Sequence, residues 1–239
     1  MTKAEIKHIK QLQQKKYRQA SGEFLVEGLK SIIDFLQAGF VPKKIYSTTA
    51  FDNDYKQSIE IEIIDNKSLK SISLLKNPKD ALAIFEIKMH HKIPSKGHIL
   101  ALDNLQDPGN LGTIIRTADW FGIQNIVCSV DTVDCYNPKV VQATMGSLAN
   151  VSVIYTDLAN YLTENTLPIY GAFLSGKSIY KTQIPSDAII VIGNEGNGIS
   201  DRIGKLIKER ISIPKRKNTR AESLNAAIAT AIIISNLAK

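Results

Sequence analysis

Residues 99–121 read Ile-Leu-Ala-Leu-Asp-Asn-Leu-Gln-Asp-Pro-Gly-Asn-Leu-Gly-Thr-Ile-Ile-Arg-Thr-Ala-Asp-Trp-Phe and pass from an apolar run through a turn into a helical pattern. The run 99–102 has the length of a buried strand, and the turn 107–110 ends on Asn110, a residue type that favours a helix N-cap. The helix that follows is predicted to bury its apolar residues at helical spacing, which are Leu111, Ile114, Ile115, Ala118 and Phe121. Strand, turn and helix together predict one unit of an α/β fold.

The polar side chains of the same helix indicate a site. Asn110, Thr113 and Arg116 recur three residues apart, away from the apolar positions. The turn is therefore expected to present an amide beside an arginine. A simpler interpretation is a strand-to-helix corner whose arginine is only solvated, and this stretch alone is compatible with both.

The composition limits the class of protein. The 239 residues suffice for two domains, and a net charge of +7 favours a polyanionic partner, although many basic proteins bind none. Cys128 and Cys135 are too few for a disulfide framework and lack metal-ligand spacing, so we expect reduced thiols and no metal. The chain begins without an apolar leader and has no run near the roughly 18 residues of a membrane span. We expect a soluble cytoplasmic protein that does not associate with membranes.

The first part of the chain opens with a basic segment. Residues 2–19 predict one helix with a thin apolar stripe and a cationic exposed face, on which Lys15, Lys16 and Arg18 are candidates to contact phosphates. A solvated helix kept soluble by its lysines is the alternative. Residues 24–87 predict a compact α/β unit, and residues 88–98 a linker, in which we interpret His90 and His91 as surface residues rather than metal ligands.

The second part alternates strands with helices. Strands are predicted at 99–102, 125–129, 151–155, 169–173, 188–192 and 211–214, and helices at 138–146, 157–163, 200–209 and 222–237. Such alternation predicts a parallel sheet covered by helices.

A glycine-rich loop at 193–198 follows the apolar strand 188–192. It lacks the lysine of a phosphate-binding loop and the glycine spacing of a dinucleotide fingerprint, and Glu195 would repel a pyrophosphate. Glu195 could instead hold an arginine, a hydroxyl or a cationic ligand. Further on, helix capping alone could account for Ser223, but it does not account for Asn225.

Three motifs occur in order along the second part. They are Asn104-x-x-Asp107-Pro108-x-Asn110-x-Gly112-x-x-x-Arg116, Ile192-Gly193-Asn194-Glu195-Gly196-x-Gly198, and Ile213-Pro214 followed by Glu222-Ser223-Leu224-Asn225. Together they resemble the SpoU (TrmH-like) RNA ribose 2′-O-methyltransferases of the SPOUT superfamily. The resemblance covers residues 99–239 strongly, and residues 24–28 are more loosely similar to the small L30e-like domain of the family.

This resemblance implies a fold and its partners. Residues 98–239 are expected to form a SPOUT methyltransferase domain with a parallel sheet and a deep trefoil knot, an exception to the usual unknotted topology. Residues 1–92 are expected to form an L30e-like α/β domain that binds the RNA substrate. The resemblance also implies a homodimer, S-adenosylmethionine as cofactor, and a ribosomal or transfer RNA as substrate.

The resemblance also assigns roles to residues. The matched catalytic positions are Asn110, Arg116, Glu195, Ser223 and Asn225. The matched cofactor-binding positions are Leu174, Ser175, Gly176, Gly193, Asn194, Gly196, Ile213 and Leu224. The residues expected to meet RNA are Lys15, Lys16, Arg18, Lys215, Arg216, Lys217 and Arg220. Because all the cofactor positions follow residue 99, we expect residues 93–239 to bind the cofactor alone.

The expected chemistry fits these residue types. A ribose hydroxyl is a weak nucleophile, so methyl transfer from a sulfonium needs a hydrogen-bonded base and an in-line approach. Arg116 is the family's candidate base, but a guanidinium is almost always protonated, so Arg116 could instead orient the hydroxyl or a phosphate. Glu195 would then hold Arg116.

The sequence departs from the family at three places: the loop 215–221, Gln142 where a basic residue is common, and Ala226 where valine is usual. Two rival functions also remain. The loop 215–221 is longer than usual, basic and free of glycine, which affects the expected cofactor loop. A catalytically idle RNA-binding scaffold would share the basic face. A nucleotide-binding α/β protein would use the loop 193–198, but the missing lysine argues against it.

Overall fold

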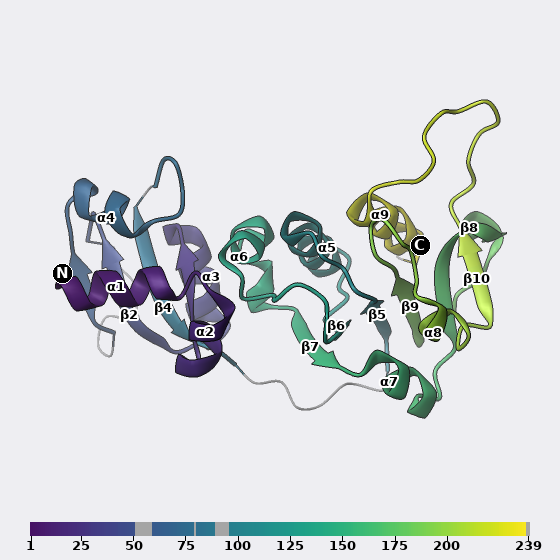
Figure 1. The fold of residues 1–239 in the computed structure, drawn as a ribbon, viewed down its shortest axis with the longest axis horizontal. Coiled ribbons are helices and arrows are strands. Elements are labelled where there is room, and N and C mark those ends of the chain that lie inside the picture. Colours follow the sequence, from purple (N-terminus) through teal and green to yellow (C-terminus); the bar gives the residue numbers. More distant parts are fainter. Residues whose placement is uncertain (51–58, 79, 89–95, 238–239) are drawn as a thin grey trace. The chain divides into compact units, whose positions relative to one another are not determined.

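The computed structural model describes residues 1–50, 59–78, 80–88 and 96–237. The chain forms two compact units (Figure 1). The first comprises Met1–Met89 together with Asp134–Ala149, and the second comprises His90–Val133 together with Asn150–Lys239. His90 and His91 lie outside the described residues, as does most of the expected linker.

The first unit is a mixed sheet with helices. Its strands are β1 (Glu23–Glu27), β2 (Pro42–Ser47), β3 (Ile61–Ile63) and β4 (Ala81–Glu86), in the order β1-β4-β2-β3. β4 pairs antiparallel with β1 and β2, whereas β2 and β3 are parallel. Its helices are α1 (Lys3–Gln11), α2 (Lys15–Ser21), α3 (Leu29–Gln37) and α4 (Asn66–Ile72). The expected α/β unit over residues 24–87 is therefore present.

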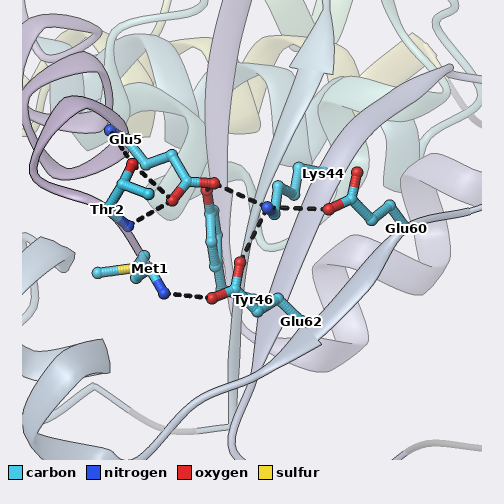
Figure 2. A network of polar contacts seen from close by, with 7 residues as sticks. All are labelled: Met1, Thr2, Glu5, Lys44, Tyr46, Glu60 and Glu62. Carbon is cyan, nitrogen blue, oxygen red and sulfur yellow. Dashed lines mark hydrogen bonds and ion pairs between the residues drawn. The ribbon is translucent and has the colours of Figure 1, made fainter.

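A polar network fastens the start of α1 to this sheet (Figure 2). The Lys44 ammonium on β2 lies 2.7 Å from Glu5, 2.9 Å from Glu60 and 2.8 Å from Glu62. The hydrogen bond from Lys44 lowers the pKa of the Glu5 carboxyl to about 2, helped by bonds from Thr2. Thr2 and Glu5 also form a capping box, which explains why α1 begins where it does.

The predicted basic helix is divided into α1 and α2, and one of its cations is buried. Lys15 and Lys16 are exposed, as expected. Arg18 is only 1% exposed. Its Nε and Nη2 donate to Asp134 Oδ2 at 3.1 and 2.5 Å, and its Nη1 donates to the Leu12 carbonyl at 2.9 Å. The prediction that Arg18 lies on the RNA-facing side of the helix is wrong, because its guanidinium is buried and paired with Asp134.

The segment 134–149 packs with the first unit although the chain enters it from the second. It contains α6 (Pro138–Thr144) and the short 3-10 helix η1 (Ser147–Ala149). The Tyr136 ring lies 4.5 Å from the Phe24 ring, and Tyr136 donates to the Lys88 carbonyl at 3.3 Å. The predicted domains 1–92 and 98–239 are contiguous in sequence, whereas this compact unit takes residues from both.

The second unit is built on a six-stranded parallel sheet, as predicted. Its strand order is β10-β8-β9-β5-β6-β7, and every neighbouring pair is parallel. The strands are β5 (His98–Leu102), β6 (Asn125–Ser129), β7 (Ser152–Thr156), β8 (Ile169–Ser178), β9 (Ala188–Ile192) and β10 (Glu209–Ser212). β9 is buried along its whole length, as its unbroken apolar sequence predicts.

Helices cover both faces of this sheet. α7 (Leu158–Glu164) and α8 (Asp201–Gly204) pack on one face through a shared apolar cluster with β5, β6 and β9. α5 (Pro108–Trp120) and α9 (Ala226–Leu237) pack on each other on the opposite side (Figure 1). No helix among the described residues is long and apolar enough to cross a membrane.

Several predicted boundaries were wrong. The helix expected at 200–209 is only the four residues of α8, and its expected last residue, Glu209, belongs to β10, which pairs with β8. β8 runs five residues beyond the expected end at 173. α9 begins at Ala226 and not at 222, and Phe121 is half-buried rather than core.

Candidate active site

The site lies where three parallel strands end. These strands are β5, β9 and β10: β5 and β9 are adjacent in the sheet, and β8 lies between β9 and β10. Because the carboxyl ends of parallel strands share one edge, the segments after β5, β9 and β10 come to the same side, where ligands bind in open α/β sheets. Each of the three sequence motifs begins at one of these strand ends.

Asn110 joins the three motifs by hydrogen bonds. Its amide nitrogen donates to Glu195 Oε1 at 3.0 Å, and its Oδ1 accepts from Asn225 Nδ2 at 2.8 Å. Asn110 is only 9% exposed, so both bonds form in a partly desolvated place. The structure thus brings together three of the five predicted catalytic residues.

The Glu195 carboxylate is held by the loop before α5. It accepts from the backbone amides of Gln106 at 3.3 Å and Asp107 at 3.2 Å, besides Asn110. Burial pushes the pKa of Glu195 upward, but these hydrogen bonds outweigh it and leave the pKa below its ordinary value of 4.5. Glu195 is therefore ionised at neutral pH and acts as an acceptor that orders its neighbours.

The expected partnership between Glu195 and Arg116 is absent in the described part of the chain, where no hydrogen bond or ion pair joins the two. Arg116 is exposed on α5. The hydroxyls of Thr113 and Thr117 donate to carbonyls four residues earlier, so they turn back onto their own helix. Arg116 is left facing solvent, available for a ligand.

Two capping assignments differ from expectation. Asp107, not Asn110, is the N-cap of α5, and its Oδ1 accepts from the Asn110 amide at 2.8 Å. Asn225 caps α9, because its Oδ1 accepts from the backbone of Ala227 at 2.9 Å and Ile228 at 3.3 Å. The expectation that capping does not account for Asn225 is therefore wrong for its Oδ1, which caps α9. Ser223 is exposed and precedes the helix.

The glycine-rich loop is closed upon itself. Asn194 and Gly198 exchange backbone hydrogen bonds of 2.9 and 3.0 Å, and the Asn194 side chain accepts from Gly196 N and Asn197 N. A Cβ on Gly193 would lie 2.2 Å from the Gly198 carbonyl carbon, so only glycine fits there. This closed loop carries a carboxylate and is unlike an open phosphate cradle.

The other predicted cofactor residues border the same edge. Leu174, Ser175 and Gly176 lie on an exposed excursion of β8, where the pairing with β10 skips between Arg210 and Ile211. A Cβ on Gly176 would meet the Arg210 carbonyl oxygen at 2.6 Å, so close packing of the strands already requires this glycine. Leu174 is 81% and Leu224 is 47% exposed, and Ile213 is half-buried.

The loop after β10 is exposed and carries the predicted cations Lys215, Arg216, Lys217 and Arg220. In this glycine-free loop Asn218 has a φ of 65°, in the left-handed region that asparagine tolerates. In the described residues there is no group of three or more side chains that could hold a metal ion.

Sequence reasoning missed how the loop before α5 is held. The backbone amides of Gln106 and Asp107 leave no signature in a side-chain pattern. Asp103, which is 5% exposed, accepts from Ser200 N at 2.7 Å and ties the strand end of β5 to the start of α8. A buried aspartate directly after an apolar strand is a signal that could have been used.

A parallel α/β sheet with a polar cluster at its strand ends is the architecture of an α/β enzyme. Residues 97–235 match the SpoU rRNA Methylase family, and residues 3–83 match the MRM3-like substrate binding domain. The first match covers more than half of the chain, and the chain belongs to the SpoU rRNA methylase family. It is therefore an RNA methyltransferase, and the rival assignment as an idle scaffold is not supported.

Relatives agree along the whole chain. The 23S rRNA (guanosine(2553)-2′-O)-methyltransferase RlmP of Bacillus subtilis is 29% identical over 97% of this chain and 95% of its own. A solved TrmH-family protein from Porphyromonas gingivalis is 35% identical, with a TM-score of 0.88 over 99% of this chain and 97% of its own. An AdoMet-bound rRNA methyltransferase from Sinorhizobium meliloti is 28% identical, with a TM-score of 0.89 over 99% and 94%. The predicted cofactor is thus the one bound in a relative.

Proposed function

We propose that this enzyme transfers the methyl group of S-adenosylmethionine to a ribose 2′-hydroxyl of a structured RNA. The observation that carries the proposal is the hydrogen-bonded chain from Glu195 through Asn110 to Asn225. It supports a single site, because residues about 85 and 115 positions apart meet with 3.0 and 2.8 Å bonds. Relatives along the full chain are named as rRNA methyltransferases, and RlmP as a 2′-O enzyme.

The chain's residues fit the cofactor. Gly193, Asn194 and Gly196 would hold its polar parts through backbone carbonyl oxygens, because the amides of Asn194 and Gly196 already donate within the loop. The side chains of Ile213, Leu224 and Leu174 would cover its apolar parts, with Ser175 and Gly176 beside them. The exposure of Leu174 and Leu224 supports this role, because a large apolar side chain in water gains from a ligand. S-adenosylmethionine, when bound, supplies an electrophilic methyl on a sulfonium.

Arg116 orients the acceptor. Its exposed guanidinium has five donors in a planar fork, which can hold a ribose oxygen and a phosphate together. Glu195 is a positioning residue: it fixes Asn110 and the loop before α5, and its lowered pKa makes it a weak base. Asn225 fixes the start of α9 and, through Asn110, ties it to that loop. Ser223 is left free to meet the substrate.

The exposed cations bind RNA. Lys15 and Lys16 on α2 and the loop cations Lys215, Arg216, Lys217 and Arg220 are all on the surface, and the net charge of +7 supports a polyanion. Ribosomal RNA is the favoured substrate over transfer RNA because the relatives are named for it. We further propose a cytoplasmic homodimer whose catalytic unit carries the family's trefoil knot.

The test is chemical. A 2′-O-methyl removes the nucleophile that alkali needs to cut the next phosphodiester. RNA from cells lacking this protein, treated with the enzyme and methyl-labelled cofactor, should therefore leave its label in alkali-resistant dinucleotides. Label in mononucleotides that carry a methylated base would overturn the ribose assignment. Comparing 2′-O-methyl maps of total RNA with and without the protein would then identify the nucleotide.

A further inference from the structure

The first unit contains a cavity of about 350 Å³ that has no role in the proposed reaction. One wall comes from β1 and the segment after α4, and the other wall comes from α6. The lining residues are Leu25, Glu27, Leu74, Leu75, Pro138, Lys139, Val141, Gln142 and Ala143. We propose that this cavity takes one unstacked nucleobase of the RNA substrate, an inference that rests on the proposed function.

The cavity is built from elements that are held in place. The Glu27 carboxylate accepts from Leu74 N at 3.0 Å and from the Ser73 hydroxyl, which fixes the segment after α4 onto β1. Asn137 caps the start of α6 by accepting from Lys139 N at 3.0 Å. The buried pair of Arg18 with Asp134 anchors the chain four residues before α6. A preformed cavity binds with little ordering cost.

Its lining matches the chemistry of a base. Leu74, which is 45% exposed, and the half-buried Leu75 offer aliphatic surface to the faces of a planar ring, while Leu25 and Val141 line the cavity and are buried. Gln142 offers an amide donor and acceptor to the ring edge. Lys139 is exposed on the same helix, where an ammonium suits the phosphate of the extruded nucleotide. Among the described residues, no hydrogen bond or ion pair engages the side chains of Lys139 or Gln142.

The two walls belong to two different family matches. Leu25, Glu27, Leu74 and Leu75 lie in the region that matches a substrate binding domain, and α6 lies in the region that matches the methylase. A base seated there would touch both. The volume is near the lower end of small-ligand sites, roughly 300–1000 Å³, which suits one base rather than a larger ligand. RNA proteins commonly read splayed bases in such pockets.

The first test fills the cavity. Ala143→Phe places a ring into the space, and Ala4→Phe adds the same ring at an exposed position of α1 that does not line it. Methylation of RNA from cells lacking the protein is measured, with thermal unfolding as a check on folding. We expect Ala143→Phe to raise KM for RNA at least tenfold with kcat within twofold, and Ala4→Phe to change neither by more than twofold. An unchanged KM in a folded Ala143→Phe variant would overturn the proposal.

The second test needs no variant. The full-length enzyme is photocrosslinked to large-subunit rRNA transcribed with 4-thiouridine or, separately, 6-thioguanosine. We expect crosslinked peptides to include residues 138–143 or 74–75, and crosslinks that avoid both would overturn the proposal. A filled cavity that impairs methylation of ribosomal particles but not of naked RNA would also overturn it, in favour of a protein occupant. Loss of all methylation by the wild type would instead contradict the proposed function.

Discussion

The two compact units use arginine in opposite ways. In the first unit Arg18 is 1% exposed and donates hydrogen bonds to Asp134 and to the Leu12 carbonyl. In the second unit Arg116 is exposed, and no ion pair among the described residues engages it. Both arginines lie in helices, Arg18 in α2 and Arg116 in α5, and the sequence around each predicted a polar helix face. We therefore interpret a cation as structural where the protein supplies its counter-charge, and as available for a ligand where it does not.

The first prediction removes the structural arginine. Arg18→Ala leaves the Asp134 carboxylate, itself 16% exposed, without its cation, and breaking a buried pair costs about 3–5 kcal/mol of the free energy of unfolding. Urea unfolding monitored by circular dichroism measures the loss. The exposed Lys16→Ala is the control and should change that free energy by less than about 0.5 kcal/mol. Equal stability of the two variants would mean that the pair of Arg18 with Asp134 adds nothing to the free energy of unfolding.

The second prediction removes Arg116, the arginine that we propose orients the acceptor. Arg116→Ala should lower the methylation rate at least about 100-fold, or roughly 2.7 kcal/mol, since the acceptor loses its orienting group. Arg116→Lys should not rescue, because a point charge lacks the planar fork. Cofactor affinity by calorimetry and the unfolding midpoint should stay near wild type. Turnover above about a tenth of the wild-type rate would exclude Arg116 as base or orienting group.

Sequence predicted the second unit better than the first. The apolar run 188–192 and the alternation around it specify a parallel sheet, since a strand buried on both faces has no polar positions. One boundary failed where strand pairing overrides the local pattern: Glu209 and Arg210 pair with β8, although the pattern predicts a helix as far as 209. Of the candidate site, the resemblance to the family named Asn110, Glu195 and Asn225, which the structure brings together, but it could not indicate the backbone amides that hold Glu195.

The segment 134–149 shows a limit of reading domains along the chain. Its residues follow a strand of the second unit, yet Tyr136 packs on Phe24 and Asp134 pairs with Arg18. No local pattern could indicate this, because the partners are over 110 residues away. We expect residues 93–239 to bind the cofactor alone, but such a fragment would be less stable, because it would expose Val140 and Val141, which are buried in the whole chain.

The third prediction concerns Glu195, whose carboxylate is held by hydrogen bonds in the second unit. Glu195→Gln keeps the shape but weakens four hydrogen bonds to a charged acceptor, and should lower the free energy of unfolding by about 1–2 kcal/mol at pH 7. Because the folded-state pKa lies below 4.5, this stabilisation is complete above about pH 5 and fades as the pH falls below 4.5. Melting curves from pH 7 to 3 should show the gap to wild type narrowing on acidification. A constant gap would mean that the carboxylate charge is irrelevant.

The smallest effects belong to the exposed lysines, which sharpen the contrast with Arg18. Each lysine that meets a phosphate releases counterions, so Lys15→Ala with Lys16→Ala should weaken RNA binding and reduce the slope of log K against log salt by about 0.7–0.9 per contact. The pair Lys215→Ala with Lys217→Ala should do the same. Lys43→Ala is the matched control, because Lys43 is ion-paired with Glu86 and its charge is already satisfied.

If the slope falls equally for Lys43 and for Lys15 with Lys16 when counted per charge, the effect is that of net charge alone, and α2 is only a solvated helix. If it falls only for the lysines that form no ion pair among the described residues, the presence or absence of an internal carboxylate separates the cations that bind RNA from those that stabilise the protein.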